Sequence, residues 1–343
     1  MLSAEQLEQL YVYHNKTLGS HYVIAIDNTL RGPALGGCRI SDTYVDLDHA
    51  LSDAIALAKA MTMKSTYAGL PFGGGKAVIL MPKEAQPIRD KILKDFATHL
   101  NALGGRYITS LDFGSTQEDI QILSEHTNYL VGLNNQKQNE HDTAFYTAAG
   151  IFKGMKAALV HTEGEANFIE KRVVVKGVGK VGLHLIKQLL NAKARVFAFD
   201  INAEQLEAQS KTLGFSIVTP DEAISMQSDI FAPCSKAGTV TEYFARTVNT
   251  RIICGAENNQ IASDTAERIL MHRHVHYLPD FVVNAGGVLC AAKMMNILTD
   301  KTLNDKLEDV HVNCVKLLEK SQRTGLRTSL LAREQANNLL FEV

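Results

Sequence analysis

The sequence is poor in cysteine and has no spacing that would link its cysteines together. Five are present among 343 residues, all far apart and without a C-x-x-C pair: Cys38, Cys234, Cys254, Cys290 and Cys314. An odd number of widely spaced cysteines suits reduced thiols in a cytosolic protein. We expect Cys38 and Cys290 to be small core residues.

An excess of charge of one sign is also absent. The 35 Lys and Arg residues nearly balance 37 Asp and Glu, for a net charge of −2, so nothing favours binding to nucleic acid or to an anionic membrane. No apolar run reaches membrane-spanning length. The opening segment, MLSAEQLEQLYVYHN, carries early charges and lacks the apolar core of a signal peptide. We therefore expect a cytoplasmic globular protein without membrane or nucleic-acid partners.

The length predicts two domains. In the first half, residues 20–30 and 77–81 are typical of strands, and the segment between them has the apolar period of a helix. That period is formed by Leu47, Ala50, Leu51, Ala54, Ile55, Ala58 and Met61. A second helix is expected over 87–103, followed by a strand, RYITSLDFG, that ends at Asp112. The first half is therefore predicted to be a mixed α/β domain.

The second half alternates strands with helices. The run KRVVVKGVGKVGLHLIKQLLNAKARVFAFD reads as strand, glycine turn, helix and strand, and SDIFAPC, RIICGAENN and VHYLPDFVVNAGG are expected to be later strands. This alternation predicts a doubly wound parallel sheet, a Rossmann-like domain. Residues from about 301 onward are expected to be helical. We place the first domain at 1–138, completed by helices within 318–343, and the second at 139–317.

The glycine turn of the second half matches a dinucleotide fingerprint. Gly177, Gly179 and Gly182 follow a strand and open a helix. They would permit the tight turn, the approach of a pyrophosphate and the packing of helix on strand. Asp200 ends the next strand, where a carboxylate would bind both ribose hydroxyls and repel a 2′-phosphate, which favours NAD over NADP. The plainer alternative is a glycine turn in an unrelated α/β unit.

A second glycine-rich stretch, PFGGGKAVIL at residues 71–80, places Lys76 at the start of an apolar run. It is not a phosphate-binding loop, because the required first glycine and the Ser or Thr after the lysine are missing. The glycines could instead leave room for a substrate beside a buried amine, with Lys64 as a neighbouring cation and Asp112 as a carboxyl partner. Alternatively, both lysines extend along the surface toward water.

Eight ordered motifs resemble one enzyme family. They are GPALGGCRI, AKAMTMKSTYAGLPFGGGKAVI, YITSLDFGST, TAAGIFKGMKAA, VKGVGKVG, DIFAPC, GAENNQI and PDFVVNAGGV. Together they resemble the Glu/Leu/Phe/Val dehydrogenase family, its leucine-specific members in particular, over residues from about 10 to about 320. The resemblance implies a substrate domain facing an NAD domain, and reversible oxidative deamination of an L-amino acid to a 2-oxo acid and ammonia.

The resemblance also implies roles for individual residues. Lys64 corresponds to the lysine that binds the substrate carboxylate, Lys76 to the lysine that activates water, and Asp112 to the aspartate that carries protons to and from the amine. Cofactor contacts are implied for Thr147, Gly177, Val178, Gly179, Lys180, Val181, Gly182, Asp200, Ile201, Ala232, Cys234, Asn258 and Asn284. Substrate contacts are implied for Leu35, Gly36, Met61, Lys64, Ser110, Asn284, Val288 and Ala291.

The substrate pocket so implied is largely apolar, which disfavours glutamate and favours leucine, valine or isoleucine. The chain departs from the family pattern at Met63, at Leu111 and in the segment before Thr147, and Glu257 has no evident role. An aromatic or broad-range dehydrogenase of the same family stays open, and so does an inactive NAD-binding regulator, although a regulator needs none of Lys64, Lys76 and Asp112. The family implies a homo-oligomer, a dimer or an octamer.

One histidine cluster invites a metal site. His272, His274 and His276, in HRHVH, would share a face if extended. No acidic partners accompany them, so we favour polar residues that lead into a strand, and we expect no metal.

Overall fold

The computed structural model describes residues 7–133, 142–235 and 238–341. The chain divides into two compact units: residues 1–141, 294–297 and 336–343 form the first, and residues 142–293 and 298–335 form the second. The predicted boundary between 138 and 139 lies outside the described residues. The assignment of a substrate domain and an NAD domain to these parts of the chain stays a prediction.

The first unit is built on a five-stranded mixed sheet with the order β1-β2-β4-β3-β5. Its strands are β1 (Gln9–Asn15), β2 (Ser20–Asn28), β3 (Ala34–Ser41), β4 (Gly73–Leu80) and β5 (Tyr107–Leu111). β2 runs antiparallel to β1 and β4, whereas β3 runs parallel to β4 and β5. Three parallel strands therefore end at one edge of the sheet, where Asp112 follows β5.

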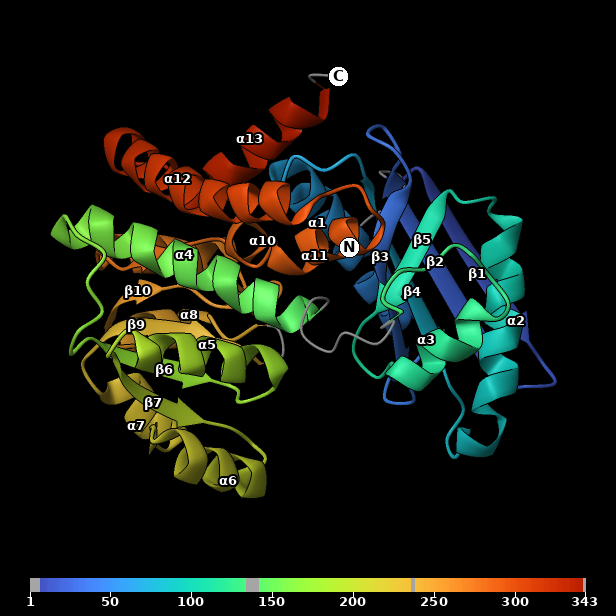
Figure 1. The fold of residues 1–343 in the computed structure, drawn as a ribbon, viewed down its shortest axis with the longest axis horizontal. Coiled ribbons are helices and arrows are strands. Elements are labelled where there is room, and N and C mark those ends of the chain that lie inside the picture. Colours follow the sequence, from blue (N-terminus) through green and yellow to red (C-terminus); the bar gives the residue numbers. More distant parts are fainter. Residues whose placement is uncertain (1–6, 134–141, 236–237, 342–343) are drawn as a thin grey trace. The chain divides into compact units, whose positions relative to one another are not determined.

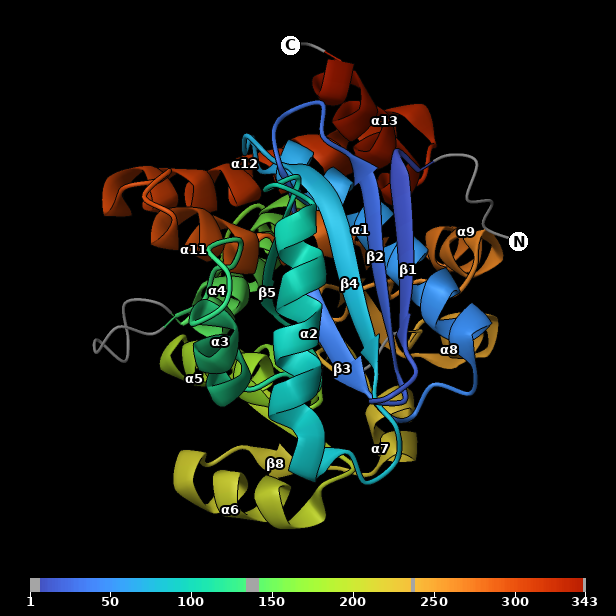
Figure 2. The same ribbon diagram turned by 90° about the vertical axis from the view of Figure 1, so that its right-hand side faces the viewer.

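Helices cover both faces of this sheet (Figure 2). They are α1 (Leu47–Tyr67), a short 3-10 helix (Gln86–Ile88), α2 (Arg89–Ala102) and α3 (Gln117–Ser124). The predicted apolar period of α1 is confirmed, since Ala50, Ala54 and Ala58 pack with Val78 of β4 in one cluster. The opposite face of the sheet packs against α2 in a second cluster. Asp46 begins α1 by accepting a hydrogen bond from the His49 amide.

The glycine run of β4 is required by packing. A Cβ at Gly74 would lie 2.2 Å from the Thr62 amide nitrogen of α1, and a Cβ at Gly75 would lie 2.6 Å from the Tyr107 ring. A Cβ at Gly73 would meet the Asn28 carbonyl oxygen at 1.9 Å. The structure thus corrects the expectation that this bare backbone is open to a substrate, because the protein itself fills the space above each glycine.

The second unit contains a six-stranded parallel sheet with the order β11-β10-β9-β6-β7-β8. Figure 1 shows β10, β9, β6 and β7 of this sheet side by side in this order. Its strands are β6 (Arg172–Lys176), β7 (Arg195–Phe199), β8 (Ser216–Ile217), β9 (Ser228–Pro233), β10 (Thr250–Ile253) and β11 (His276–Tyr277). The chain runs outward from β6 to β8 and then returns to the other side of β6 with β9. The predicted doubly wound sheet is confirmed, and the order reverses between β6 and β9.

The helices of the second unit are α4 (Thr143–Glu163), α5 (Lys180–Asn191), α6 (Ala203–Leu213), α7 (Pro220–Ser225), α8 (Glu242–Thr247), α9 (Asp264–His272), α10 (Asp280–Val283), α11 (Gly286–Met294) and α12 (Asp300–Thr324). The last helix, α13 (Thr328–Phe341), ends in the first unit. The predicted helical tail is confirmed. In the described part of the chain, no helix has the length and apolarity to cross a membrane.

Two details of the sequence-based fold were wrong. The expected strand VHYLPDFVVNAGG is a strand only at His276–Tyr277, since Pro279 directly precedes helix α10 and Asp280 favours its positive end. The strands β1 and β3 were not predicted. β3 contains Gly36 and Gly37, and glycine weakens the alternation of apolar and polar side chains that identifies a strand.

We predict that Gly74→Ala lowers the free energy of unfolding by about 3 kcal/mol, since its methyl group overlaps the backbone of α1. Denaturant-induced unfolding followed by circular dichroism measures this change. The matched control is Gly104→Ala, which has a φ of +58° and no atom within 4 Å of the new methyl group. It carries only a conformational cost of about 1 kcal/mol. Equal losses in the two variants would contradict the packing explanation.

Candidate active site and dinucleotide site

Several predicted site residues share one face of the first unit's sheet. Gly37 of β3 lies in register with Ser110 of β5, and Leu35 lies beside Gly74 of β4. Because alternate residues of a strand point to the same face, Leu35, Ser110 and Lys76 lie on one face, together with Asp112. Gly36 has the opposite parity and belongs to the other face.

Lys76 and Asp112 form an ion pair across β3. The Lys76 Nζ lies 2.5 Å from the Asp112 Oδ2, and Lys76 is only 5% exposed. The two side chains belong to strands that are separated by β3, where Gly37 presents no side chain between them. A Cβ at Gly37 would lie 2.7 Å from the Asp112 Cβ. The backbone amide of Asp112 is also fixed, since it donates to the Ser115 Oγ at 2.7 Å.

Arg39 is a second cation at Asp112, and the sequence analysis missed it. Its Nε lies 3.2 Å from the Asp112 Oδ2, and its Nη1 lies 2.6 Å from Asp53 of α1. The Asp53 carboxylate also accepts a hydrogen bond from the Tyr44 hydroxyl at 2.5 Å. The alternation of side chains along a strand could have indicated Arg39, because it stands two residues after Gly37 and so lies on the same face of β3. That signal required β3 to be recognised as a strand.

The two cations keep Asp112 ionised. Burial alone would raise the pKa of Asp112, but Lys76 and then Arg39 outweigh burial and lower the pKa to about 2. Asp112 is therefore a carboxylate near neutral pH and is able to accept a proton. Because the folded pKa lies below that of the unfolded chain, the pair contributes stability above about pH 4, and this contribution is lost as the pH falls toward 2.

The remaining predicted residues of this unit lie on β3 and α1. Leu35 is buried, whereas Met61 and Lys64 are half-buried in the second half of α1. The backbone of α1 at Thr62 lies against Gly74, two residues before Lys76 on β4. This close approach brings the end of α1 alongside the strand that carries Lys76. A direct influence of Lys64 on Lys76 stays a prediction.

In the second unit, the predicted glycine turn has the geometry of a dinucleotide site. Gly177 has a φ of +98°, a conformation that favours glycine, and a Cβ at Gly182 would lie 2.1 Å from the Gly177 carbonyl oxygen. Gly179 begins α5, is exposed and would have no atom within 4 Å of a Cβ. The turn lies where the strand order reverses, with open space at the start of a helix. These features suit a bound pyrophosphate.

Asp200 holds this turn in place. Its Oδ2 accepts a hydrogen bond from the Val178 amide at 2.6 Å, and its Oδ1 accepts one from the Asn202 amide at 2.9 Å. Each carboxylate oxygen keeps a further lone pair for a ribose hydroxyl. Around the turn, Val178 is buried and Val181 half-buried, whereas Lys180 and Ile201 are exposed.

A third group of predicted residues lies at the start of α11. The Asn284 side-chain amide donates to the Ala256 carbonyl at 3.0 Å and to the Asn258 Oδ1 at 2.9 Å. Its own Oδ1 is buried without a hydrogen-bond partner among the described residues. Such an acceptor is costly unless a ligand donates to it, so Asn284 fits a role in binding cofactor or substrate.

The other predicted residues of the second unit lie on three elements. Thr147 lies on α4 beside α11, since a Cβ at Gly287 would be 2.9 Å from its Oγ1. Val288 and Ala291 are buried one turn apart on α11. Ala232 is buried in β9, and Cys234, which follows β9, is half-buried. The expected burial of Cys38 and Cys290 is confirmed.

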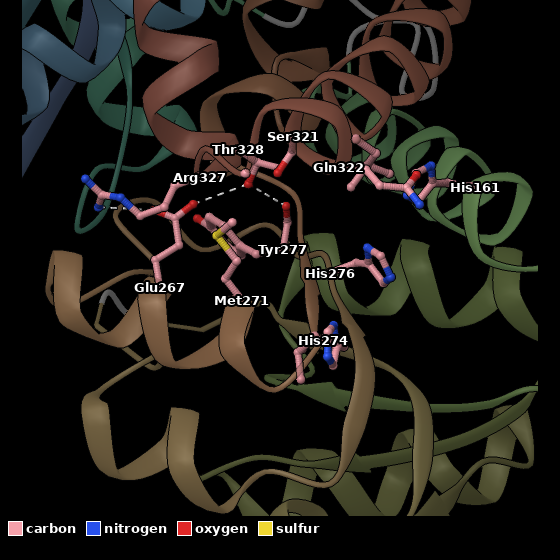
Figure 3. Close-up of a pocket in the computed structure, with 13 residues that line it drawn as sticks. His161, Glu267, Met271, His274, His276, Tyr277, Ser321, Gln322, Arg327 and Thr328 are labelled. Carbon is pink, nitrogen blue, oxygen red and sulfur yellow. Dashed lines mark hydrogen bonds and ion pairs between the residues drawn. The ribbon is translucent and has the colours of Figure 1, made fainter.

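A cavity of about 530 Å3 in the second unit contains none of the predicted site residues (Figure 3). Its wall includes His161 of α4, His274, His276, Glu267 of α9 and Arg327. Within the described ranges, no three His, Cys, Asp or Glu side chains are arranged to hold a metal ion. The HRHVH segment therefore provides part of a cavity wall.

Comparison with known proteins identifies the family. Residues 16–129 match the description "Glu/Leu/Phe/Val dehydrogenase, dimerisation domain", and residues 200–342 match "Glutamate/Leucine/Phenylalanine/Valine dehydrogenase". A leucine dehydrogenase of Bacillus cereus is 34% identical over 328 residues, which cover 95% of this chain and 88% of that protein. The chain belongs to the Glu/Leu/Phe/Val dehydrogenase family. It is an amino acid dehydrogenase, an oxidoreductase of a fold that uses a nicotinamide cofactor.

Other members of the family differ in their named substrate. A valine dehydrogenase of Streptomyces virginiae is 35% identical over 288 residues, covering 83% of this chain and 80% of that protein. The crystal structure of L-tryptophan dehydrogenase from Nostoc punctiforme has a TM-score of 0.80 at 30% identity, covering 98% and 96% of the two chains. A hetero-hexameric glutamate dehydrogenase from Thermus thermophilus shares the fold, with a TM-score of 0.77, 19% identity and coverage of 97% and 89%.

We predict that Lys76→Met raises the pKa of Asp112 by roughly 1 to 3 pH units, since burial then opposes ionisation with Arg39 as the main remaining cation. Titration of 13C-labelled aspartate carboxyls by NMR measures this pKa, and Asp112→Asn identifies the signal. Lys91→Met, at an exposed position of α2, is the control and leaves the titration unchanged. An Asp112 pKa that stays near 2 in Lys76→Met would contradict the pairing.

Proposed function

We propose that this dehydrogenase catalyses the reversible NAD-dependent oxidative deamination of a branched aliphatic L-amino acid, as leucine dehydrogenases do. One L-amino acid, NAD+ and water give the 2-oxo acid, ammonium, NADH and a proton. The observation that carries the proposal is the ion pair of the buried Lys76 with the half-buried Asp112, at 2.5 Å, on the sheet face that also holds Leu35 and Ser110.

In the proposed mechanism, the side chains of the first unit bind the substrate and move protons. Lys64 binds the substrate carboxylate as a point charge. Lys76, in its neutral form, removes a proton from the water that attacks the imine carbon. Asp112 starts as a carboxylate, receives from Lys76 the proton that Lys76 has removed from water, and delivers it to the departing amine. Arg39 is a positioning residue that holds Asp112 when Lys76 changes its protonation state.

The proposed cofactor contacts lie in the second unit. Gly177, Gly179 and Gly182 accommodate the pyrophosphate, and Asp200 binds the ribose hydroxyls. A nicotinamide held there would supply the acceptor for the hydride of the substrate α-carbon. Asn284 offers its unpartnered Oδ1 to the bound molecules. NAD is favoured over NADP because the Asp200 carboxylate repels a 2′-phosphate.

A branched aliphatic substrate is supported by the proposed substrate contacts and by the relatives. Leu35, Val288 and Ala291 are buried and apolar, and no lysine among the proposed substrate contacts is reserved for a side-chain carboxylate. Relatives named leucine and valine dehydrogenases cover most of the chain. One methylene changes discrimination by only about 1–3 kcal/mol, so we propose overlapping aliphatic substrates.

An aromatic amino acid is the second candidate. The relative named L-tryptophan dehydrogenase is 30% identical over 332 residues, covers 96% of this chain and has a similar fold.

We further propose that the enzyme works in the cytoplasm as a homo-oligomer, a dimer or an octamer. The family description of residues 16–129 as a dimerisation domain supports self-association.

We predict that a screen of 2-oxo acids with ammonia consumes NADH fastest with the 2-oxo acids of leucine, valine and isoleucine. Loss of NADH absorbance measures the rate, and NADPH in place of NADH tests the cofactor assignment. Phenylpyruvate and indole-3-pyruvate test the aromatic alternative. Fastest turnover with an aromatic 2-oxo acid would replace the proposed substrate class, and no turnover with any acid, while NADH still binds, would indicate an inactive nucleotide-binding regulator.

We predict that Lys76→Ala reduces kcat by at least about 100-fold, since general base catalysis contributes about that much, while NADH binding survives. Lys64→Ala should mainly raise KM for the amino acid, because it removes the partner of the carboxylate. Steady-state kinetics and NADH fluorescence titration separate these effects. Lys94→Ala, at an exposed position of α2, is the control, and near-normal kcat in Lys76→Ala would refute the mechanism.

A further inference from the structure

Glu257 is a buried acid that the proposed reaction does not use. It is 2% exposed and lies just after β10, in the segment GAENN. Its Oε1 accepts a hydrogen bond from the Thr239 amide at 2.7 Å, and its Oε2 accepts one from the Thr239 hydroxyl. Burial raises the pKa of Glu257, and the nearby Asp280 acts in the same direction, whereas Thr239 and Lys176 lower it. A buried carboxylate of this kind is costly unless something fixes its charge.

Lys176 provides the compensating charge through Thr239. The Lys176 Nζ donates to the Thr239 Oγ1 at 2.5 Å. An ammonium group has no lone pair to accept with, so the hydroxyl must accept from Lys176 and donate to Glu257. In this order Glu257 accepts a hydrogen bond at each of its two carboxyl oxygens. Lys176, Thr239 and Glu257 therefore form one series of hydrogen bonds, which runs from the Lys176 ammonium group through the Thr239 hydroxyl to the Glu257 carboxylate.

The hydrogen bonds among Lys176, Thr239 and Glu257 connect the ends of three parallel strands at the dinucleotide turn. Lys176 is the last residue of β6, directly before Gly177, and its carbonyl accepts from the Cys234 amide after β9 at 2.7 Å. Thr239 lies in the segment after β9, and Glu257 follows β10. The order of the sheet reverses between β6 and β9, which is where dinucleotides bind in such folds.

The same connection extends toward Asn284. Glu257 is followed by Asn258, whose Oδ1 accepts from the Asn284 side-chain amide, and the Gly238 amide donates to the Asn259 carbonyl at 3.2 Å. Residues before and after Glu257 in this segment thus contact both the Thr239 segment and the start of α11. A shift of the Glu257 carboxylate would be transmitted to each of them.

We infer that Lys176, Thr239 and Glu257 are positioning residues that fix the segments after β6, β9 and β10 around the nicotinamide dinucleotide and thereby set the affinity for the cofactor. None of the three needs to contact the reacting atoms. The inference deepens the proposed function and rests on the placement of the cofactor at Gly177–Gly182.

The test is a double-mutant cycle with Glu257→Gln and Lys176→Met. Each single variant leaves one charge without its partner, so each should weaken NADH binding about five- to tenfold, the effect of losing one typical hydrogen bond. The double variant removes both charges and should lose much less than the product of the two single effects. Fluorescence titration of NADH measures the Kd, and steady-state kinetics should show kcat and the KM for the amino acid within about twofold of wild type.

The Thr239 hydroxyl gives an independent pair of variants. Thr239→Val keeps the shape of the side chain but removes the hydroxyl that links Lys176 to Glu257, so this variant should bind NADH more weakly to a similar extent. Thr239→Ser keeps the hydroxyl, so that variant should bind NADH normally. Thermal unfolding of every variant accompanies the titrations. The matched control cycle uses Glu207→Gln and Lys211→Met, an exposed pair 3.8 Å apart on α6, which should leave the Kd unchanged.

The outcomes separate this inference from the proposed function. Unchanged NADH affinity in Thr239→Val and Glu257→Gln would overturn the positioning role alone, provided that the wild-type enzyme binds NADH. A lower kcat, a higher KM for the amino acid and a weaker cofactor affinity, all in proportion to the loss of thermal stability, would show a merely structural role. That result would also overturn the positioning role. A wild-type enzyme that does not bind NADH would refute both the cofactor site and the inference.

Discussion

The ion pair between Lys76 and Asp112 spans β3, and the sheet face that carries the proposed catalytic residues of the first unit depends on this contact. A side chain at position 37 would collide with Asp112, so β3 has to present glycine where the pair passes over it. Lys76 is buried and Asp112 is half-buried, and a carboxylate withdrawn from water needs compensating charge. Lys76 supplies that charge, Arg39 adds to it, and Asp53 in turn holds Arg39.

The glycines of the second unit serve a different purpose from those of β4 in the first unit. At Gly177 the chain needs a positive φ, at Gly182 the helix must approach the turn, and at Gly179 the space is open. Only the last of these is free for a ligand. In the first unit, the space above Gly73, Gly74 and Gly75 is occupied by the protein. Glycine-rich motifs therefore need a structure before their purpose is known, because packing and ligand binding produce the same sequence pattern.

Much of the architecture could be predicted from local patterns. The period of α1 over Ala50, Ala54 and Ala58, the doubly wound sheet and the helical tail are present in the structure. The dinucleotide turn was recognisable because its glycines and Asp200 lie on consecutive elements of a single strand–helix–strand unit. β3 escaped prediction because glycine removes the alternating side chains. Arg39 was missed for the same reason, since the face on which its side chain lies is known only when β3 is recognised as a strand.

The sequence by itself determined the family, the glycine turn between β6 and α5, and the identity of the lysines and the aspartate proposed for catalysis, because these are encoded as residue types in ordered motifs. Only the tertiary structure decided that Lys76 meets Asp112, that Arg39 joins them, and that Glu257 is linked to Lys176 through Thr239. Each of these contacts connects residues from 18 to 73 positions apart. Their meeting depends on the order of strands in a sheet, which no local pattern of side chains records.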